Sequence, residues 1–359
     1  HNRTHSFPTR RSSDLLLEQD GYDTTDGTAD RLARVLHDDT AGNPLFLREV
    51  LRELRENGSL VEKDGRLSMS RLVDDMGIPQ GVRDVIGQRL ERLGPDAVPV
   101  MRSAAVIGRN FSAGLVQAVS DLDEETVLDV LDRALEARLL RETDRARLQF
   151  SHALVRAVLV DEISSGRRQR LHRDVAHALQ RARGPDAAAI SYHLVEAADV
   201  VSPEEVIRAA MAAARQHAAG TTYDLAIAEL DRAMAAVEDK AIDGAVEAAC
   251  LLTRGQVLMR SGDVMAAREA IHAATTTPGA TAETVVQAAL AFHGPARVTA
   301  PDDRELPLYR RALDMLDDRQ DPALASRLHA NLALGAPSRD AAQREHVRLA
   351  MELAATTDD

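Results

Sequence analysis

The feature that most constrains this chain is a seven-residue stretch, Phe150–Arg156, at which a strand pattern gives way to a helix pattern. Two short apolar segments precede it, at 139–142 and 147–150, and the polar turn between them predicts a β-hairpin. After it, apolar residues recur at helical spacing, which predicts a helix with Ser151 as its cap. Helices followed by a hairpin and a further helix predict a winged-helix domain, which we place at residues 76–184.

The first 75 residues divide into a tail and a helical segment. Residues 1–15 resemble the translation of a sequencing adapter, so we expect an adapter-derived or disordered tail joined to part of a longer reading frame. Residues 16–75 predict the remnant of a helical lid. Within it, Leu60–Met69 reads as two strands, and Asp64-Gly65 supplies the positive φ angles of a tight hairpin turn.

Residues 185–359 predict a helical repeat array, because each segment has a helical pattern and short turns separate the segments. Two segments superpose at an offset of 41 residues, with small and large residues at equivalent positions. The matched residues are Tyr223, Ala226, Leu230 and Ala233 in the first copy and Val264, Ala267, Ile271 and Ala274 in the second. Small residues that let paired helices approach are typical of tetratricopeptide repeats, whose usual period is about 34 residues. We therefore expect an irregular tetratricopeptide-like superhelix with one continuous core.

Composition and charge exclude several classes of function. The chain is 45% hydrophobic and 28% charged, and its net charge of −13 argues against broad nucleic-acid binding. Its single cysteine, Cys250, excludes an internal disulfide framework and multi-cysteine metal sites. No apolar run reaches the ~18 residues that span a bilayer, so we expect a cytoplasmic protein without a membrane partner. The predicted fold is mainly α, with small β-hairpins in the lid and the winged helix.

Five segments resemble one family, the bacterial STAND-type ATPases, and within it the MalT-like and large ATP-binding LuxR-type regulators. The segments are Thr40–Phe46, Ile78–Ile86, Ala104–Phe111, Phe150–Arg156 and Arg170–His172, in the family's order. Such proteins carry an AAA-like P-loop ATPase domain, a helical lid, a winged helix, a tetratricopeptide sensor arm and often a C-terminal helix-turn-helix. The resemblance implies that this chain is the middle of that arrangement.

The resemblance also implies ATP or ADP as the cofactor of the complete protein. The chain has no G-x-x-x-x-G-K-[ST] motif and no strand ending in paired acidic residues, so we expect this fragment neither to hydrolyse ATP nor to bind it tightly. Gly42, Asn43 and Pro44 are similar to the family's turn against the adenine and ribose. Gly permits a close backbone approach there and Pro fixes the turn. The alternative is a helix-start turn without a ligand.

His152 is the second candidate nucleotide contact. In STAND relatives of the plant-resistance and apoptosis type, a histidine in a similar setting contacts the β-phosphate of ADP and holds the closed state. An imidazole can donate a hydrogen bond to phosphate from either tautomer, and more strongly when protonated. Ala153 stands where that motif has aspartate. The alternative is a histidine bonded to local backbone at the corner of the domain.

Arginines are concentrated near one predicted helix of the winged-helix domain. They are Arg167, Arg168, Arg170, Arg173, Arg181 and Arg183. They form either a docking surface for nucleic acid or for the ATPase domain, or a solvated face that pairs with the chain's own carboxylates. No set of residues has the pattern of a catalytic triad or a metal site, so we assign no catalytic and no metal-binding residue.

The sequence thus predicts the regulatory and sensor part of a STAND signalling ATPase, with a LuxR-type regulator as the complete protein. The expected partners are a missing N-terminal ATPase domain, an inducer or protein on the helical repeats, and a second copy after activation. DNA is expected to bind only through a missing C-terminal domain. Two alternatives remain: the regulatory region of a nucleotide cyclase or protein kinase of the same architecture, and a helical-repeat interaction scaffold.

Overall fold

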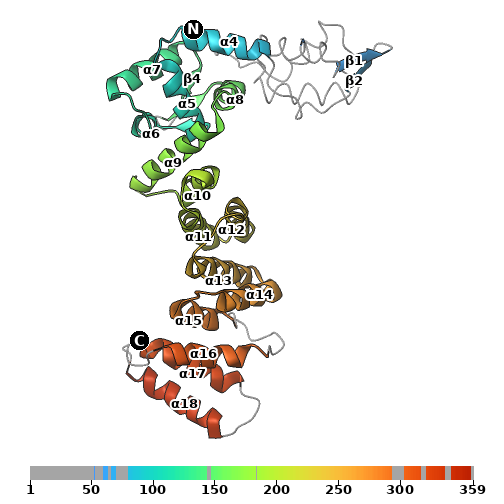
Figure 1. Cartoon of the computed structure of the whole chain (residues 1–359), viewed down its shortest axis with the longest axis vertical. Coiled ribbons are helices and arrows are strands. Elements are labelled where there is room, and N and C mark those ends of the chain that lie inside the picture. The colour runs from blue at the N-terminus through green and yellow to red at the C-terminus, as the bar shows by residue number, and fades with distance from the viewer. Residues whose placement is uncertain are drawn as a thin grey trace, which may run out of the picture. The chain divides into compact units, whose positions relative to one another are not determined.

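Helices dominate the structure, a computed structural model, and the strands form two small sheets, which confirms the predicted mainly α fold (Figure 1). The described residues are Arg52, 60–63, 66–69, 80–143, 147–182, 184–292, 303–316, 321–335 and 341–356. The predicted tail at 1–15 and the turn at Gly42, Asn43 and Pro44 lie outside these residues. The chain divides into two compact units, His1–Ala178 and Leu179–Asp359.

The predicted hairpin of the lid segment is present. Strands β1 (Leu60–Lys63) and β2 (Arg66–Met69) pair antiparallel, with Leu60 opposite Met69 and Lys63 opposite Arg66. This register leaves two residues for the connection, as Asp64-Gly65 predicts, although that turn itself lies outside the described residues.

The rest of the first unit is a winged helix. Its elements are α4 (Gln80–Glu91), α5 (Ala97–Ile107), β3 (Asn110–Phe111), α6 (Ala113–Ala118), α7 (Glu124–Glu136), β4 (Leu140–Glu142), β5 (Leu148–Phe150) and α8 (Ala153–Asp161). Side chains of Ser112 and Asp123 accept hydrogen bonds from the first turns of α6 and α7, as expected at N-caps. The sheet has the order β3-β5-β4, so β5 is its central strand. The sequence predicted β4 and β5 but missed the two-residue β3, which is too short to show an alternating pattern.

The core of this domain is built by the sheet together with α4, α5, α7 and α8. Val82, Ile86 and Leu90 of α4 are buried along one face, as their spacing predicts. Phe111 and Phe150 contribute buried rings from β3 and β5, with their centroids 5.5 Å apart. Packing of these side chains holds the end of β5, and thus the start of α8, at a fixed place in the domain.

The second unit is a succession of helices that begins after α9 (Ser165–Arg181), within which the two units divide. The helices are α10 (Ala187–Glu196), α11 (Pro203–Ala219), α12 (Tyr223–Ala236), α13 (Gly244–Ser261), α14 (Val264–Thr276), α15 (Ala282–Ala291), α16 (Glu305–Met315), α17 (Pro322–Gly335) and α18 (Ala341–Ala354), with one 3-10 turn, η2 (Ala198–Val200). Figure 1 shows α11 and α12, and then α13 and α14, as successive hairpins of helices.

The predicted repeat matches the structure element by element. Helices α12 and α14 begin at the matched residues Tyr223 and Val264, and α11 and α13 begin at Pro203 and Gly244 with the same offset. The matched alanines and large apolar residues after the first position are fully buried in both copies. The chain turns alike between the paired helices, since Thr221 and Gly262 both have positive φ angles, of 61° and 95°.

Gly255 shows why one helix of the second pair needs a small residue. A Cβ atom on Gly255 would lie 2.6 Å from Cγ1 of Ile271 and 3.2 Å from the carbonyl oxygen of Ala267. Helix α14 therefore approaches the backbone of α13 more closely than any side chain would allow. This close approach is the small-residue packing that the tetratricopeptide pattern predicts.

Candidate functional site

His152 lies at the junction between β5 and α8. It is the N-cap of α8, with extended backbone angles of −137° and 141°, and no side chain accepts a hydrogen bond from the first turn. The prediction that Ser151 caps this helix is therefore wrong. The backbone N–H of Ser151 donates to the carbonyl oxygen of Leu139 at 2.9 Å, which ties Ser151 to the residue before β4, and the N-cap is the next residue, His152.

The surroundings of His152 are electrostatically positive. Its imidazole is half-buried, and burial lowers its pKa below the ordinary value of 6.5, because charging a desolvated ring is unfavourable. Arg89 of α4 and Arg141 of β4 lower the pKa further by repulsion. The start of α8 adds a partial positive charge, as every helix N-terminus does.

This arrangement suits an anion. Helix N-termini bind phosphate and carboxylate groups through their backbone N–H groups and dipole, and here three cationic or ionisable side chains come from three different elements. Arg141 is also held in place, because its Nε donates to Oε1 of Gln149 at 2.9 Å. The sequence identified His152 through the resemblance but gave no reason to associate Arg89 or Arg141 with it.

We expect the pKa of His152 to lie below 6.5 in the folded chain and to rise when an anion binds beside it. Unfolding returns this pKa to its ordinary value, so His152 makes the folded state less stable as the pH falls below 6.5. An Arg89→Gln variant should raise the pKa of His152, because one repulsive charge is removed. NMR titration of the imidazole resonances measures both effects.

The neighbouring Arg92→Gln variant is the control, because Arg92 is exposed and does not affect the pKa of His152. It should leave that pKa unchanged. A titration of His152 at or above 6.5 in the wild-type chain would contradict the positive surroundings described here.

The exposed surface of α7, the helix that precedes strands β4 and β5, is acidic and does not suit nucleic acid. The exposed acidic residues of α7 are Glu124, Glu125, Asp129, Asp132 and Glu136. One basic residue, Arg133, lies among them. Phosphate backbones are held by Lys and Arg, so this helix repels them.

The arginines of α9 remain largely at the surface. Arg167, Arg170 and Arg181 are exposed, and Arg173 pairs with its neighbour Asp174 at 2.8 Å. Arg183 lies outside the described residues. One pair with the chain's own carboxylate thus agrees with the solvated-face interpretation, while the docking interpretation stays a prediction.

Two further findings limit the chemistry of the described residues. They include no group of three or more His, Cys, Asp or Glu side chains that could hold a metal ion, and none of their helices is long and apolar enough to cross a membrane. Cys250 is buried, and burial raises the pKa of its thiol to about 11. A thiol with so high a pKa is a poor nucleophile, which agrees with a packing role.

Comparison with known proteins yields two likenesses. A family described as "Domain of unknown function (DUF8739)" matches residues 25–67, a segment that contains Gly42, Asn43 and Pro44. Among solved structures, the chain is similar to the STAND protein with a tetratricopeptide repeat sensor from Pyrococcus horikoshii, at 10% identity and a TM-score of 0.41. The likeness covers 97% of this chain and 54% of that protein, so the chain spans about half its length. No curated protein matches the chain at a significant level.

Proposed function

We propose that this chain is the regulatory and sensor part of a STAND signalling ATPase and that the complete protein is a LuxR-type transcription regulator. The observation that carries the proposal is the position of His152, at the start of α8 and within the influence of the positive charges of Arg89 and Arg141. These residues fit a phosphate group in charge and in the type of donor that they offer. The sequence motifs around His152 supply the reason to assign that phosphate to ADP or ATP.

In this proposal the nucleotide supplies a negatively charged phosphate that differs between the two states of the protein. His152 donates a hydrogen bond to it, and Arg89 and Arg141 stabilise its charge. Gly42, Asn43 and Pro44 contact the adenine and ribose. The chain itself has no catalytic role; hydrolysis belongs to an ATPase domain of the complete protein.

The switch follows from differential binding. With ADP bound, the winged helix stays against the ATPase domain. An inducer on the helical repeats, together with ATP, favours the released state, in which copies of the protein associate. A ligand shifts such an equilibrium only as far as its affinity differs between the states. DNA is bound through another domain, in line with the acidic face of α7, and the regulator acts in the cytoplasm.

The proposal is tested in the complete protein with a His152→Ala variant. Loss of one hydrogen bond to a charged phosphate should weaken ADP binding about tenfold and raise the basal output, because the closed state loses its contact. Isothermal titration with ADP measures the affinity, and a reporter gene or the appropriate output assay measures the basal activity. A His217→Ala variant, altered at the end of α11, is the control and should bind ADP like the wild type. Unchanged ADP affinity in His152→Ala would contradict the proposal.

A further inference from the structure

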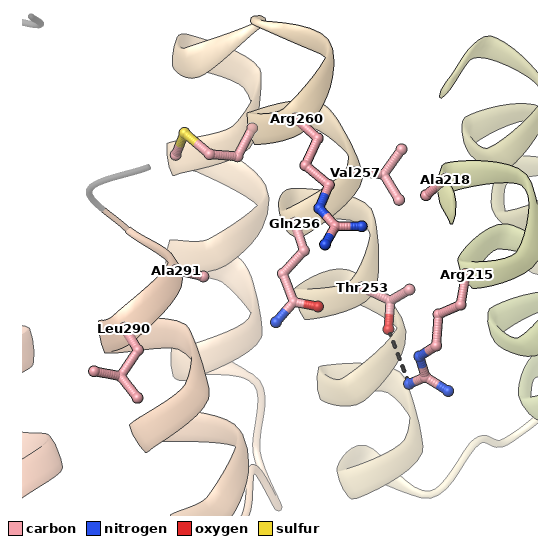
Figure 2. Close-up of a pocket in the computed structure, with 9 residues that line it drawn as sticks. Arg215, Ala218, Thr253, Gln256, Val257, Arg260, Leu290 and Ala291 are labelled. Atoms are coloured by element: carbon pink, nitrogen blue, oxygen red, sulfur yellow. Dashed lines mark hydrogen bonds between the residues drawn. The ribbon is translucent and has the colours of Figure 1, made fainter. Parts of the chain in front are cut away.

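We infer that the helical array binds a small amphipathic organic anion, with a carboxylate or phosphate group joined to an apolar body, in a hollow between α11, α13 and α15. The hollow has a volume of about 450 Å³. Pockets for small molecules commonly measure about 300–1,000 Å³ and combine apolar walls with few polar groups. Figure 2 shows the side chains that line it, which come from these three helices.

One face of α13 forms the base of the hollow. Thr253, Gln256, Val257 and Arg260 have the spacing of neighbours on a single helix face, and all four line it. Thr253 and Val257 are buried, so they form the floor, whereas Arg260 is exposed and lies at the rim. The hydroxyl group of Thr253 donates to the carbonyl oxygen of Ala249 at 2.9 Å, so the floor is mainly apolar toward a ligand.

The walls come from the helices on either side. Ala218 of α11 and Leu290 and Ala291 of α15 line the hollow, and the small alanine side chains leave the space open. Arg215 of α11 reaches across to α13, where its Nη2 lies 3.5 Å from Oγ1 of Thr253 (Figure 2). Apolar walls and a floor of this kind fit an apolar ligand body.

The two guanidinium groups determine the charge of the ligand. Some arginines of the array pair with carboxylates, for example Arg232 with Glu229 at 2.6 Å, Arg254 with Asp231 at 2.9 Å and Arg304 with Glu269 at 2.9 Å. Among the described residues, no carboxylate lies within ion-pair distance of Arg215 or Arg260, and none lines the hollow. In a chain of net charge −13, two cations in the lining of one hollow favour an anion there.

A second, neighbouring hollow indicates where the charged group of the ligand does not bind. It measures about 290 Å³ and shares Arg215, Thr253 and Gln256 with the first, but Glu283 also lines it. The carboxylate of Glu283 repels a second negative group there. The anionic group therefore belongs in the first hollow, whose lining has Arg215 and Arg260 and no carboxylate, and where a guanidinium can bind carboxylate or phosphate through two parallel hydrogen bonds.

The role of this hollow as an inducer site depends on the function proposed above. Its ability to bind an organic anion does not depend on that function. The binding test uses the chain alone, without nucleotide. Its result is therefore independent of the result of the ADP experiment. The probes are hexanoate, 3-phenylpropionate and hexyl phosphate, each compared with its neutral counterpart, hexanamide, 3-phenylpropanamide and hexanol. Saturation-transfer NMR detects binding, and isothermal titration measures the dissociation constants.

We expect at least one anion to bind, and its neutral counterpart to bind at least tenfold more weakly. The tighter of the carboxylate and phosphate probes identifies the anionic group. Arg215→Gln and Arg260→Gln should each weaken binding about tenfold, because each removes a hydrogen bond to a charged group. Arg254→Gln is the matched control, since Arg254 lies on the same helix but pairs with Asp231 away from the hollow, and it should leave the affinity unchanged.

Three results would overturn the inference. They are the absence of binding by every anion, equal affinity for charged and neutral probes, and wild-type affinity in both hollow variants. Because Arg215 and Arg260 are exposed, their replacement should not unfold the array, and circular dichroism of each variant verifies this.

Discussion

Replacing Phe150 with alanine should lower the free energy of unfolding of the winged-helix domain by about 3–5 kcal/mol, the usual range for a buried Phe→Ala change. Phe150 is 2% exposed, and its ring lies 5.5 Å from that of Phe111, with the planes inclined by 51°. Phe150 also lies on β5, the strand to which both β3 and β4 pair. Truncation would therefore leave a cavity at the centre of the sheet.

The measurement should report on this domain separately from the helical array. The chain has no tryptophan, so urea unfolding is followed by far-UV circular dichroism, combined with hydrogen exchange of the amides of α5 and α8. The matched control is Leu128→Ala on α7, because Leu128 is 43% exposed and its truncation should cost less than about 1 kcal/mol. A loss below about 1 kcal/mol in Phe150→Ala would contradict the packing described here.

Phe150 also links stability to the candidate site, since it lies two residues before His152. If packing of β5 fixes the start of α8, Phe150→Ala should move the pKa of His152 toward 6.5, as burial and the fixed distances to Arg89 and Arg141 are lost. Phe150→Leu keeps an apolar side chain at this place and should retain a lowered pKa.

A Gly244→Ala substitution should destabilise the array by about 3 kcal/mol, at the upper end for overpacked sites. Gly244 is the first residue of α13, and a Cβ atom there would lie 1.8 Å from the carbonyl oxygen of Pro278. The turn that contains Pro278 and Gly279 connects α14 to α15, and Gly279 has a positive φ angle of 93°. Because the obstructing atom is backbone, no side-chain rotation relieves the clash, and the turn itself has to move.

Hydrogen exchange of α13 and α15 and the urea midpoint of the array measure this effect. Gly166→Ala is the matched control, because Gly166 is also near a helix start, in α9, and nothing lies within 4 Å of its added Cβ atom. That variant should be as stable as the wild type or more stable by up to about 1 kcal/mol, since alanine is the better helix former. Equal stability of Gly244→Ala and wild type would mean that this turn does not approach α13 as the structure shows.

The sequence predicted most helices well because their signals are local. Apolar spacing identified the buried face of α4, Ser112 and Asp123 identified two helix starts, and the offset of 41 residues identified the repeated pair. The prediction at Ser151 was wrong for a reason that is not local. Whether residue 151 or 152 is the N-cap of α8 depends on the hydrogen bond from Ser151 to Leu139, which exists only once the sheet has formed.

The candidate site was predicted only in part. His152 came from a motif, and its place at a helix start was correct. Its positive surroundings were not predictable, because Arg89 and Arg141 lie on α4 and β4 and their spacing along the chain carries no signal. The hollow at Arg215 and Arg260 was missed entirely, and only its position on a helical repeat array was anticipated.

The sequence by itself determined most of the secondary structure, the two kinds of architecture and the repeat, since periodicity and caps act within a few residues of the backbone. Only the tertiary structure decided which arginines lie near His152, which arginines line the hollow without an ion pair, and why Gly244 cannot carry a side chain. These features depend on contacts between residues far apart in the chain, and those contacts are set by the packing of whole helices and strands.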